Sequence, residues 1–234
     1  MNKDLEVNIE QEEVVSNENI DGIEEVEELE LTSEQLQALL GGEEYIDMAA
    51  MLESEMVVNR TLYLNQEITL DTINYIIQLI HKFNRDDYDI PLEQRIPIVI
   101  YIDSVGGEIY RGLSLCSAIE SSETPVIGVL QGSCMSMALI IWQSCHVRYA
   151  SRFSNVLYHT LRAGSDIETL PEMKNKIKHY EYLQKMLDDY ILEKTEIPKK
   201  KLKKKRESNL DWFLTFSDLT KYKMYDYVID LPNK

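Results

Sequence analysis

The strongest constraint on the fold is a repeated order of apolar run, small-residue turn and helical period. Residues 98–102 form a run of mostly β-branched residues, which is typical of a buried strand in a parallel sheet. The pair Gly106-Gly107 follows, and apolar residues then recur at helical spacing up to Glu120. Residues 124–142 repeat this order. The pattern predicts an open α/β fold whose ligands lie beyond the carboxyl ends of the strands.

Further segments extend this pattern in both directions. We expect additional strands at 61–64, 154–158 and 227–231, and additional helices at 69–84, 199–208 and 217–222. Thr69 or Asp71 can cap the first of these helices. The longest predicted helix, from Asp166 to about Glu196, has an apolar seam at 3–4 spacing and Pro171 in its first turn. Because it is longer than a domain of this size needs for its own core, it predicts a self-association surface.

Charge divides the chain in two. The first 56 of the 234 residues carry 18 of the 41 acidic residues but only one of the 24 basic residues, which accounts for the whole net charge of −17. We therefore predict an acidic, largely disordered extension over 1–56 and a folded domain over 57–234. Short helices are expected at 33–42 and 47–56. We interpret the extension as a solvated tail, with a pro-segment or a partner-docking arm as the alternatives.

Composition excludes several classes of protein. No apolar run reaches the roughly 18 to 20 residues of a membrane span, and the acidic N-terminus lacks the basic start of a signal peptide. Cys116, Cys134 and Cys145 each lie in an apolar stretch without metal-ligand spacing, which suits buried free thiols in a reducing compartment. The Gly106-Gly107 turn is neither a dinucleotide fingerprint nor a Walker loop. We expect a cytoplasmic protein with no membrane contact, metal or cofactor.

The run Lys199–Arg206 is basic at seven of its eight positions. Such a run invites a nucleic-acid interpretation. It lacks interleaved aromatic residues, however, and the charge of the rest of the domain is balanced. We interpret it as a solvated helix face and expect no nucleic-acid partner; contact with the acidic extension is the other alternative.

Ser136 has two competing interpretations. It is expected at the N-terminus of the helix that follows the turn 131–134, where backbone N–H groups are unsatisfied. Its hydroxyl can cap that helix, or it can act as a nucleophile whose developing oxyanion is held by nearby amides. The local sequence by itself favours the cap.

Acyl hydrolysis requires a hydroxyl nucleophile, a base with a pKa near about 7, an orienting carboxylate and N–H donors for the oxyanion. Ser136, His159 and Asp211 can supply the first three, and the amides of Gly107 and Met137 the fourth. Of the four histidines, His159 ends a strand of buried type, although a structural role is its alternative. The surroundings of the serine are not G-x-S-x-G, so an α/β-hydrolase is not indicated.

Four motifs occur in order between about Asn59 and Asp230: YIDSVGGEIYRG, QGSCMSMALII, RYASRFSNVLYHTL and SNLDWFLTFSDL. They resemble motifs of the proteolytic subunit of the Clp protease (ClpP), in the crotonase-like superfamily. The resemblance implies a ClpP/crotonase-like fold of repeated β-α units, with 166–196 as a handle helix between two rings. It also implies stacked heptamers, which form a tetradecamer, fed with unfolded polypeptide by an AAA+ unfoldase.

The same resemblance assigns roles to the five candidate residues. It implies that Ser136 is the nucleophile, His159 the base and Asp211 the orienting carboxylate. It implies that the backbone amides of Gly107 and Met137 form the oxyanion hole. The expected activity is therefore that of a serine endopeptidase.

Departures from the family pattern surround these residues. Val105 replaces the proline before the glycine pair, and Met135 and Ala138 replace an alanine and a glycine beside the serine. The loop 162–165 is shorter than its counterpart, and Lys223 stands where a glycine usually ends the last helix. These changes predict altered active-site walls in a divergent member, plausibly of phage or plasmid origin.

Three alternatives to a ring-forming endopeptidase remain open at this stage. The first is a capsid or prohead maturation protease of the same fold. The second is a catalytically inactive ring subunit, which would have no chemical need for all of Ser136, His159 and Asp211. The third is a crotonase-like acyl-CoA enzyme, which would use the oxyanion amides without the triad.

Overall fold

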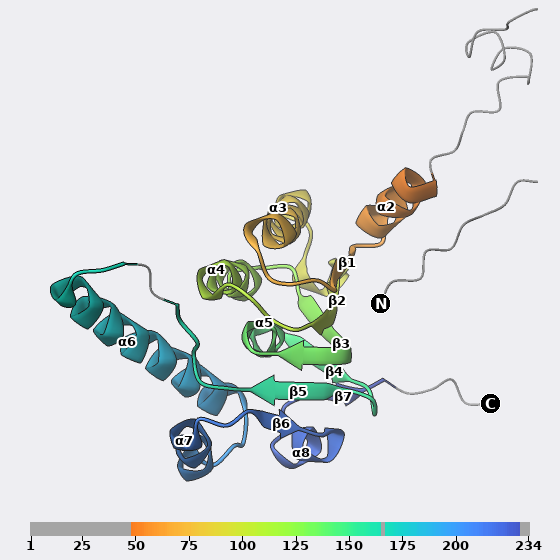
Figure 1. Cartoon of the computed structure of the whole chain (residues 1–234). Coiled ribbons are helices and arrows are strands. Elements are labelled where there is room, and N and C mark those ends of the chain that lie inside the picture. The colour runs from red at the N-terminus through yellow and green to blue at the C-terminus, as the bar shows by residue number, and fades with distance from the viewer. Residues whose placement is uncertain (1–47, 165–166, 230–234) are drawn as a thin grey trace, which may run out of the picture. The chain divides into compact units, whose positions relative to one another are not determined.

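The structure is a computed structural model that describes residues 48–164 and 167–229 (Figure 1). The chain divides after Ile46, and the second unit, Asp47–Lys234, holds all described residues. The predicted helix at 33–42, the residue Asp166 and residues 230–231 of the last predicted strand lie outside the described residues. The boundary near residue 56 stays a prediction.

A seven-stranded, mostly parallel sheet organises the fold (Figure 1). Its main path is β1-β2-β3-β4-β7, and all neighbours on this path are parallel. The end of β3 pairs in parallel with β5, which pairs antiparallel with β6. This arrangement confirms the predicted α/β class. The strands are β1 (Thr61–Leu64), β2 (Ile98–Ser104), β3 (Val126–Met135), β4 (Val147–Ala150), β5 (Asn155–Tyr158), β6 (Trp212–Leu214) and β7 (Tyr227–Val228).

Helices follow the strands in the predicted order. Among the described residues they are α2 (Met48–Val58), α3 (Leu70–Asp86), α4 (Ile109–Glu120), α5 (Met137–Ser144), α6 (Leu170–Lys194), α7 (Lys199–Ser208) and α8 (Phe216–Lys221), with a 3-10 turn at Leu92–Gln94. Thr69 caps α3 through a capping box with Thr72, as one of the two expected caps. Helix α6 begins at Leu170, not at 166, because a capping box between Thr169 and Glu172 starts it there.

Helix α5 lies at the centre of the packing. All eight of its residues are buried, and it contacts α4, α6 and β3. Figure 1 shows it between α4 and the sheet. A helix that is mostly apolar and has no exposed face belongs in a core. The residue that precedes it, Ser136, is therefore fixed to the most enclosed element of the described structure.

Two findings concern the expected absence of a membrane span and the expected burial of the cysteine thiols. No helix within residues 48–164 and 167–229 is long and apolar enough to cross a membrane. Cys116, Cys134 and Cys145 are free and buried, as predicted, and burial raises the pKa of the Cys116 thiol to about 12.

Candidate active site

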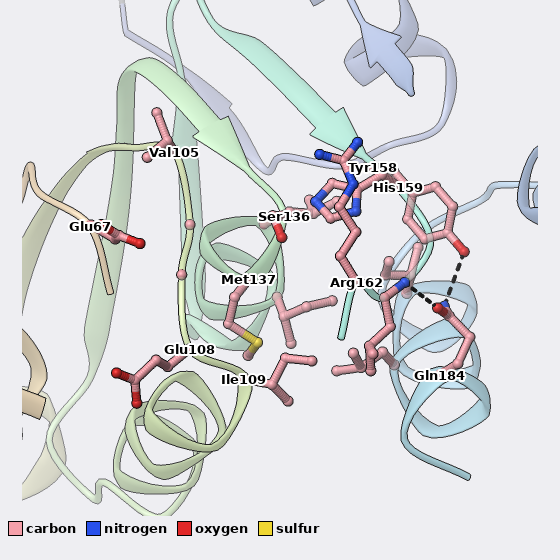
Figure 2. Close-up of a pocket in the computed structure, with 17 residues that line it drawn as sticks. Glu67, Val105, Glu108, Ile109, Ser136, Met137, Tyr158, His159, Arg162 and Gln184 are labelled. Atoms are coloured by element: carbon pink, nitrogen blue, oxygen red, sulfur yellow. Dashed lines mark hydrogen bonds between the residues drawn. The ribbon is translucent and has the colours of Figure 1, made fainter. Parts of the chain in front are cut away.

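Ser136 occupies the sharp turn between β3 and α5. Its backbone has φ 55° and ψ −124°, an unusual conformation for a residue with a side chain, and its N–H donates to the carbonyl of Leu157 at 2.9 Å. Although it is the N-cap of α5 by position, its hydroxyl caps no amide of that helix. The capping interpretation is therefore wrong, and the hydroxyl faces a cavity instead (Figure 2).

The loop after β2 is held against this turn by its backbone. Ile68 donates to the carbonyl of Gly106 at 2.8 Å and accepts from the amide of Glu108 at 2.9 Å. Because both bonds use the neighbours of Gly107, the N–H and C=O of Gly107 point away from Ile68. Gly106 has φ +95°, and a Cβ there would lie 2.8 Å from the Cβ of Ser136. Close approach of the loop to the serine thus requires glycine.

A cavity of about 500 Å³ lies between this loop and α6 (Figure 2). Gly107, Ser136, Met137 and His159 line it together. Within the described chain, the amides of Gly107 and Met137 donate to no backbone carbonyl. The remaining lining is mainly apolar, with Glu67, Glu108 and Arg162 at its polar edge and Val105, Ile109, Leu139, Ile140, Leu161, Leu187 and Ile191 among its walls.

His159 stands directly after β5 and lines the same cavity as Gly107. Its Nδ1 lies 2.7 Å from the carbonyl oxygen of Thr160, in the same stretch of chain. The carboxylate of Asp211 instead accepts a hydrogen bond from Arg162 at 2.6 Å. His159 and Asp211 line a second, adjacent cavity with Asn209. The structure thus brings Ser136 and His159 to one cavity and His159 and Asp211 to the next, without joining the three by hydrogen bonds.

Comparison with known proteins identifies the family. The Clp protease family model matches residues 42–232, which is most of the chain. The chain belongs to the Clp protease family.

Relatives of this Clp-family chain are named proteolytic subunits of an ATP-dependent Clp protease. The protein from Deinococcus radiodurans is 30% identical over 135 residues, which cover 57% of this chain and 65% of that protein. Subunit 2 from Prochlorococcus marinus (strain MIT 9313) is 24% identical, and subunit 3 from Synechococcus sp. (strain CC9605) 26%. Each of these two alignments covers 76% of this chain and 86% of the relative. The names indicate a peptidase.

A buried polar network next to the His159 segment was not predicted from the sequence. The carboxylate of Asp188 on α6 accepts from the hydroxyl of Tyr158 at 2.6 Å, from Gln184 at 2.8 Å and from Arg206 of α7 at 2.8 Å. The one available signal was that Gln184 and Asp188, four residues apart, lie on the buried side of α6 with Leu187 and Ile191. A buried carboxylate on a seam of apolar residues requires partners.

The basic run on α7 is only partly a solvated face. Lys201 lies over the rings of Trp212 and Tyr222, at 5.4 and 5.0 Å from their centroids. Arg206 pairs with Asp188. These Clp-family residues therefore help to pack α7 against α6, β6 and α8.

Proposed function

We propose that this chain is a serine endopeptidase that cleaves unfolded polypeptides inside a ring-shaped homo-oligomer. The observation that carries the proposal is the position of Ser136. Its hydroxyl does not cap α5, and its backbone is strained at the start of that buried helix. It shares a cavity with His159 and with the amides of Gly107 and Met137, which donate to no backbone carbonyl of the described residues. Strain at a polar residue that faces a cavity is typical of a catalytic nucleophile.

The mechanism follows from the groups around that cavity. His159 accepts the proton from Ser136 as the Oγ attacks the peptide carbonyl, and the N–H groups of Gly107 and Met137 hold the oxyanion. The imidazolium then protonates the leaving amine, and water, activated by the same imidazole, releases the acyl group from Ser136. Asp211 orients the imidazole by accepting its Nδ1–H.

Formation of that last hydrogen bond requires a local change. His159 must exchange the Thr160 carbonyl for Asp211, and Asp211 must leave Arg162. The side chains of Arg162 and Asp211 are 71% and 39% exposed, and an exposed pair of this kind contributes only about 0.2–1 kcal/mol. We infer that assembly or substrate binding can supply this energy.

Assembly and substrate supply follow from other features. The first half of α6 projects from the domain (Figure 1). Apolar surface is exposed along α6 at Leu170, Met173, Ile177 and Tyr182. This exposed surface supports self-association. The carbonyl of Gly107, which points away from Ile68, can accept a hydrogen bond from the backbone of an extended substrate. We propose that the chain forms heptameric rings, stacked in pairs, in the cytoplasm. Because its relatives are named ATP-dependent, we propose that an AAA+ unfoldase supplies these rings with substrate.

One alternative has an observation in its favour. A catalytically inactive ring subunit would tolerate an unconnected triad, and Asp211 is bonded to Arg162 rather than to His159. Exposure of that ion pair argues that it is easily broken, so we favour the active enzyme.

Covalent labelling tests the proposal. The full-length assembled protein should react with a fluorophosphonate at Ser136, and Ser136→Ala should lose the label while keeping the same mass in solution. A matched control, Ser133→Ala, should still be labelled. Absence of label on the assembled wild-type protein would reject the endopeptidase. A heptamer or tetradecamer in solution would favour the ring over a capsid-maturation protease.

A further inference from the structure

We propose that Asp188 is a positioning residue that holds the His159 segment in place from the core of the domain. The proposal rests on the proposed function, since His159 matters to it as the base. Asp188 is only 5% exposed, and no step of the mechanism above uses it.

The geometry of the network leads to this role. One carboxylate oxygen of Asp188 accepts a hydrogen bond from the Tyr158 hydroxyl. Gln184, one turn earlier on α6, donates to the same oxygen. The side-chain carbonyl of Gln184 accepts from the backbone amide of Leu161 at 2.7 Å. The chain is therefore anchored directly before His159 and two residues after it. Figure 2 shows the contact between the Gln184 amide and the Tyr158 hydroxyl as a dashed line. Both anchors end on one face of α6.

A third anchor comes from α7. Arg206 donates to the second carboxylate oxygen of Asp188, and its backbone carbonyl accepts from the Thr160 hydroxyl at 3.3 Å. The pKa of Tyr158 is held above its usual range, mainly by burial and also by the hydrogen bond to the Asp188 carboxylate. The Tyr158 hydroxyl therefore stays protonated and acts as a donor. Asp188 thus joins β5, α6 and α7 at the residues that flank the base.

This arrangement has a mechanistic consequence. The segment of His159 must shift locally to reach Asp211, yet the imidazole must stay beside Ser136. Anchors at Tyr158, Thr160 and Leu161 restrict the movement to the His159 side chain and the loop beyond. A misplacement of about 1 Å at a catalytic group can cost about 100-fold in rate.

The test compares two neighbouring aspartates. Asp188→Asn places an amide group in the network, which cannot satisfy Tyr158, Gln184 and Arg206 together. Asp189→Asn is the matched control, because Asp189 is exposed and its ion pair is with Lys185, one turn away. Both are made in the full chain, and their masses in solution are compared with the wild type.

Two measurements are made on each variant. The first is hydrogen exchange of the peptide 157–164, which should become faster in Asp188→Asn and not in Asp189→Asn. The second is the rate of fluorophosphonate labelling, which should fall roughly 10- to 100-fold in Asp188→Asn alone. The double variant Asp188→Asn, Arg206→Gln, which restores a neutral hydrogen-bonded pair, should recover part of both losses.

The outcomes separate this inference from the proposed function. Equal exchange in the two aspartate variants would overturn the inference, whatever their activity. If the wild-type protein is not labelled at all, the proposed function fails, and hydrogen exchange still decides whether Asp188 holds the segment. If Asp188→Asn does not fold, Tyr158→Phe removes a single hydroxyl and should show the same changes in smaller measure; wild-type exchange in that variant would reject the proposal.

Discussion

The two sides of the candidate site are built in different ways. On the nucleophile side, Ser136 and the loop Gly106-Gly107 are fixed by backbone hydrogen bonds to Leu157 and Ile68, next to a helix with no exposed residue. On the histidine side, Asp211 is held by the side chain of Arg162 at the surface. Backbone hydrogen bonds in a packed core allow a single conformation. An exposed ion pair, by contrast, can adopt several side-chain conformations of similar energy. The backbone around Ser136, the proposed nucleophile, is therefore preformed, and the state of the site depends on the histidine side.

Asp211→Asn should have the largest effect of the variants that compare the two sides. Without the carboxylate, His159 loses both its correct tautomer and the stabilisation of its charged form. We expect kcat/KM for peptide cleavage to fall by about 10³- to 10⁴-fold, by analogy with unrelated serine proteases. Asp89→Asn, at an exposed loop residue, is the control. Near-wild-type turnover in Asp211→Asn would mean that another group orients the imidazole.

Gly106→Ala tests how rigid the nucleophile side is. A Cβ at this position would lie 2.6 Å from the carbonyl oxygen of Met135, and the backbone has φ +95°. The loop must move away from Ser136, so labelling should slow by roughly 100-fold. Thermal unfolding should show a loss of about 1–3 kcal/mol in stability.

Gly164→Ala is the matched control, because among the described residues, its own chain neighbours aside, no atom lies within 4 Å of a Cβ placed there. If Gly106→Ala reacted as fast as this control, the nucleophile side would not be preformed, and the contrast between the two sides would disappear.

Arg162→Gln should have the smallest effect and the opposite sign. Removal of the guanidinium frees Asp211 to approach His159, and the energy of an exposed pair limits the gain in kcat/KM to about two- to five-fold. Arg152→Gln, at another exposed arginine, should leave the rate unchanged. A decrease in the Arg162 variant would show that Arg162 serves the reaction instead of restraining it.

The sequence predicted the elements with strong local patterns. The β-branched run became β2, the repeated run before Ser136 became β3, and the basic run became α7 with the predicted ends. It did not predict β4 or β6, because strands of four and three residues are stabilised by pairing with β3, β5 and β7 rather than by their own pattern.

Within the site, local sequence identified candidate groups but not their partners. Family resemblance was needed to set His159 and Asp211 beside Ser136. The contacts of Arg162 with Asp211 and of Arg206 with Asp188 join residues 49 and 18 positions apart. Such pairs depend on how α6 and α7 pack around β5, and no spacing rule along the chain reveals them.

The burial of α5 also bears on how such a chain can diverge. With all eight positions committed to the core, nearly any replacement in Met137–Ser144 would disturb the whole fold. Selection can act with far less cost on surface positions such as Arg162, three residues after the proposed base. A member of this family could thus acquire or lose a restraint on its activity by drift at its surface, while the element behind its nucleophile stays almost unchanged.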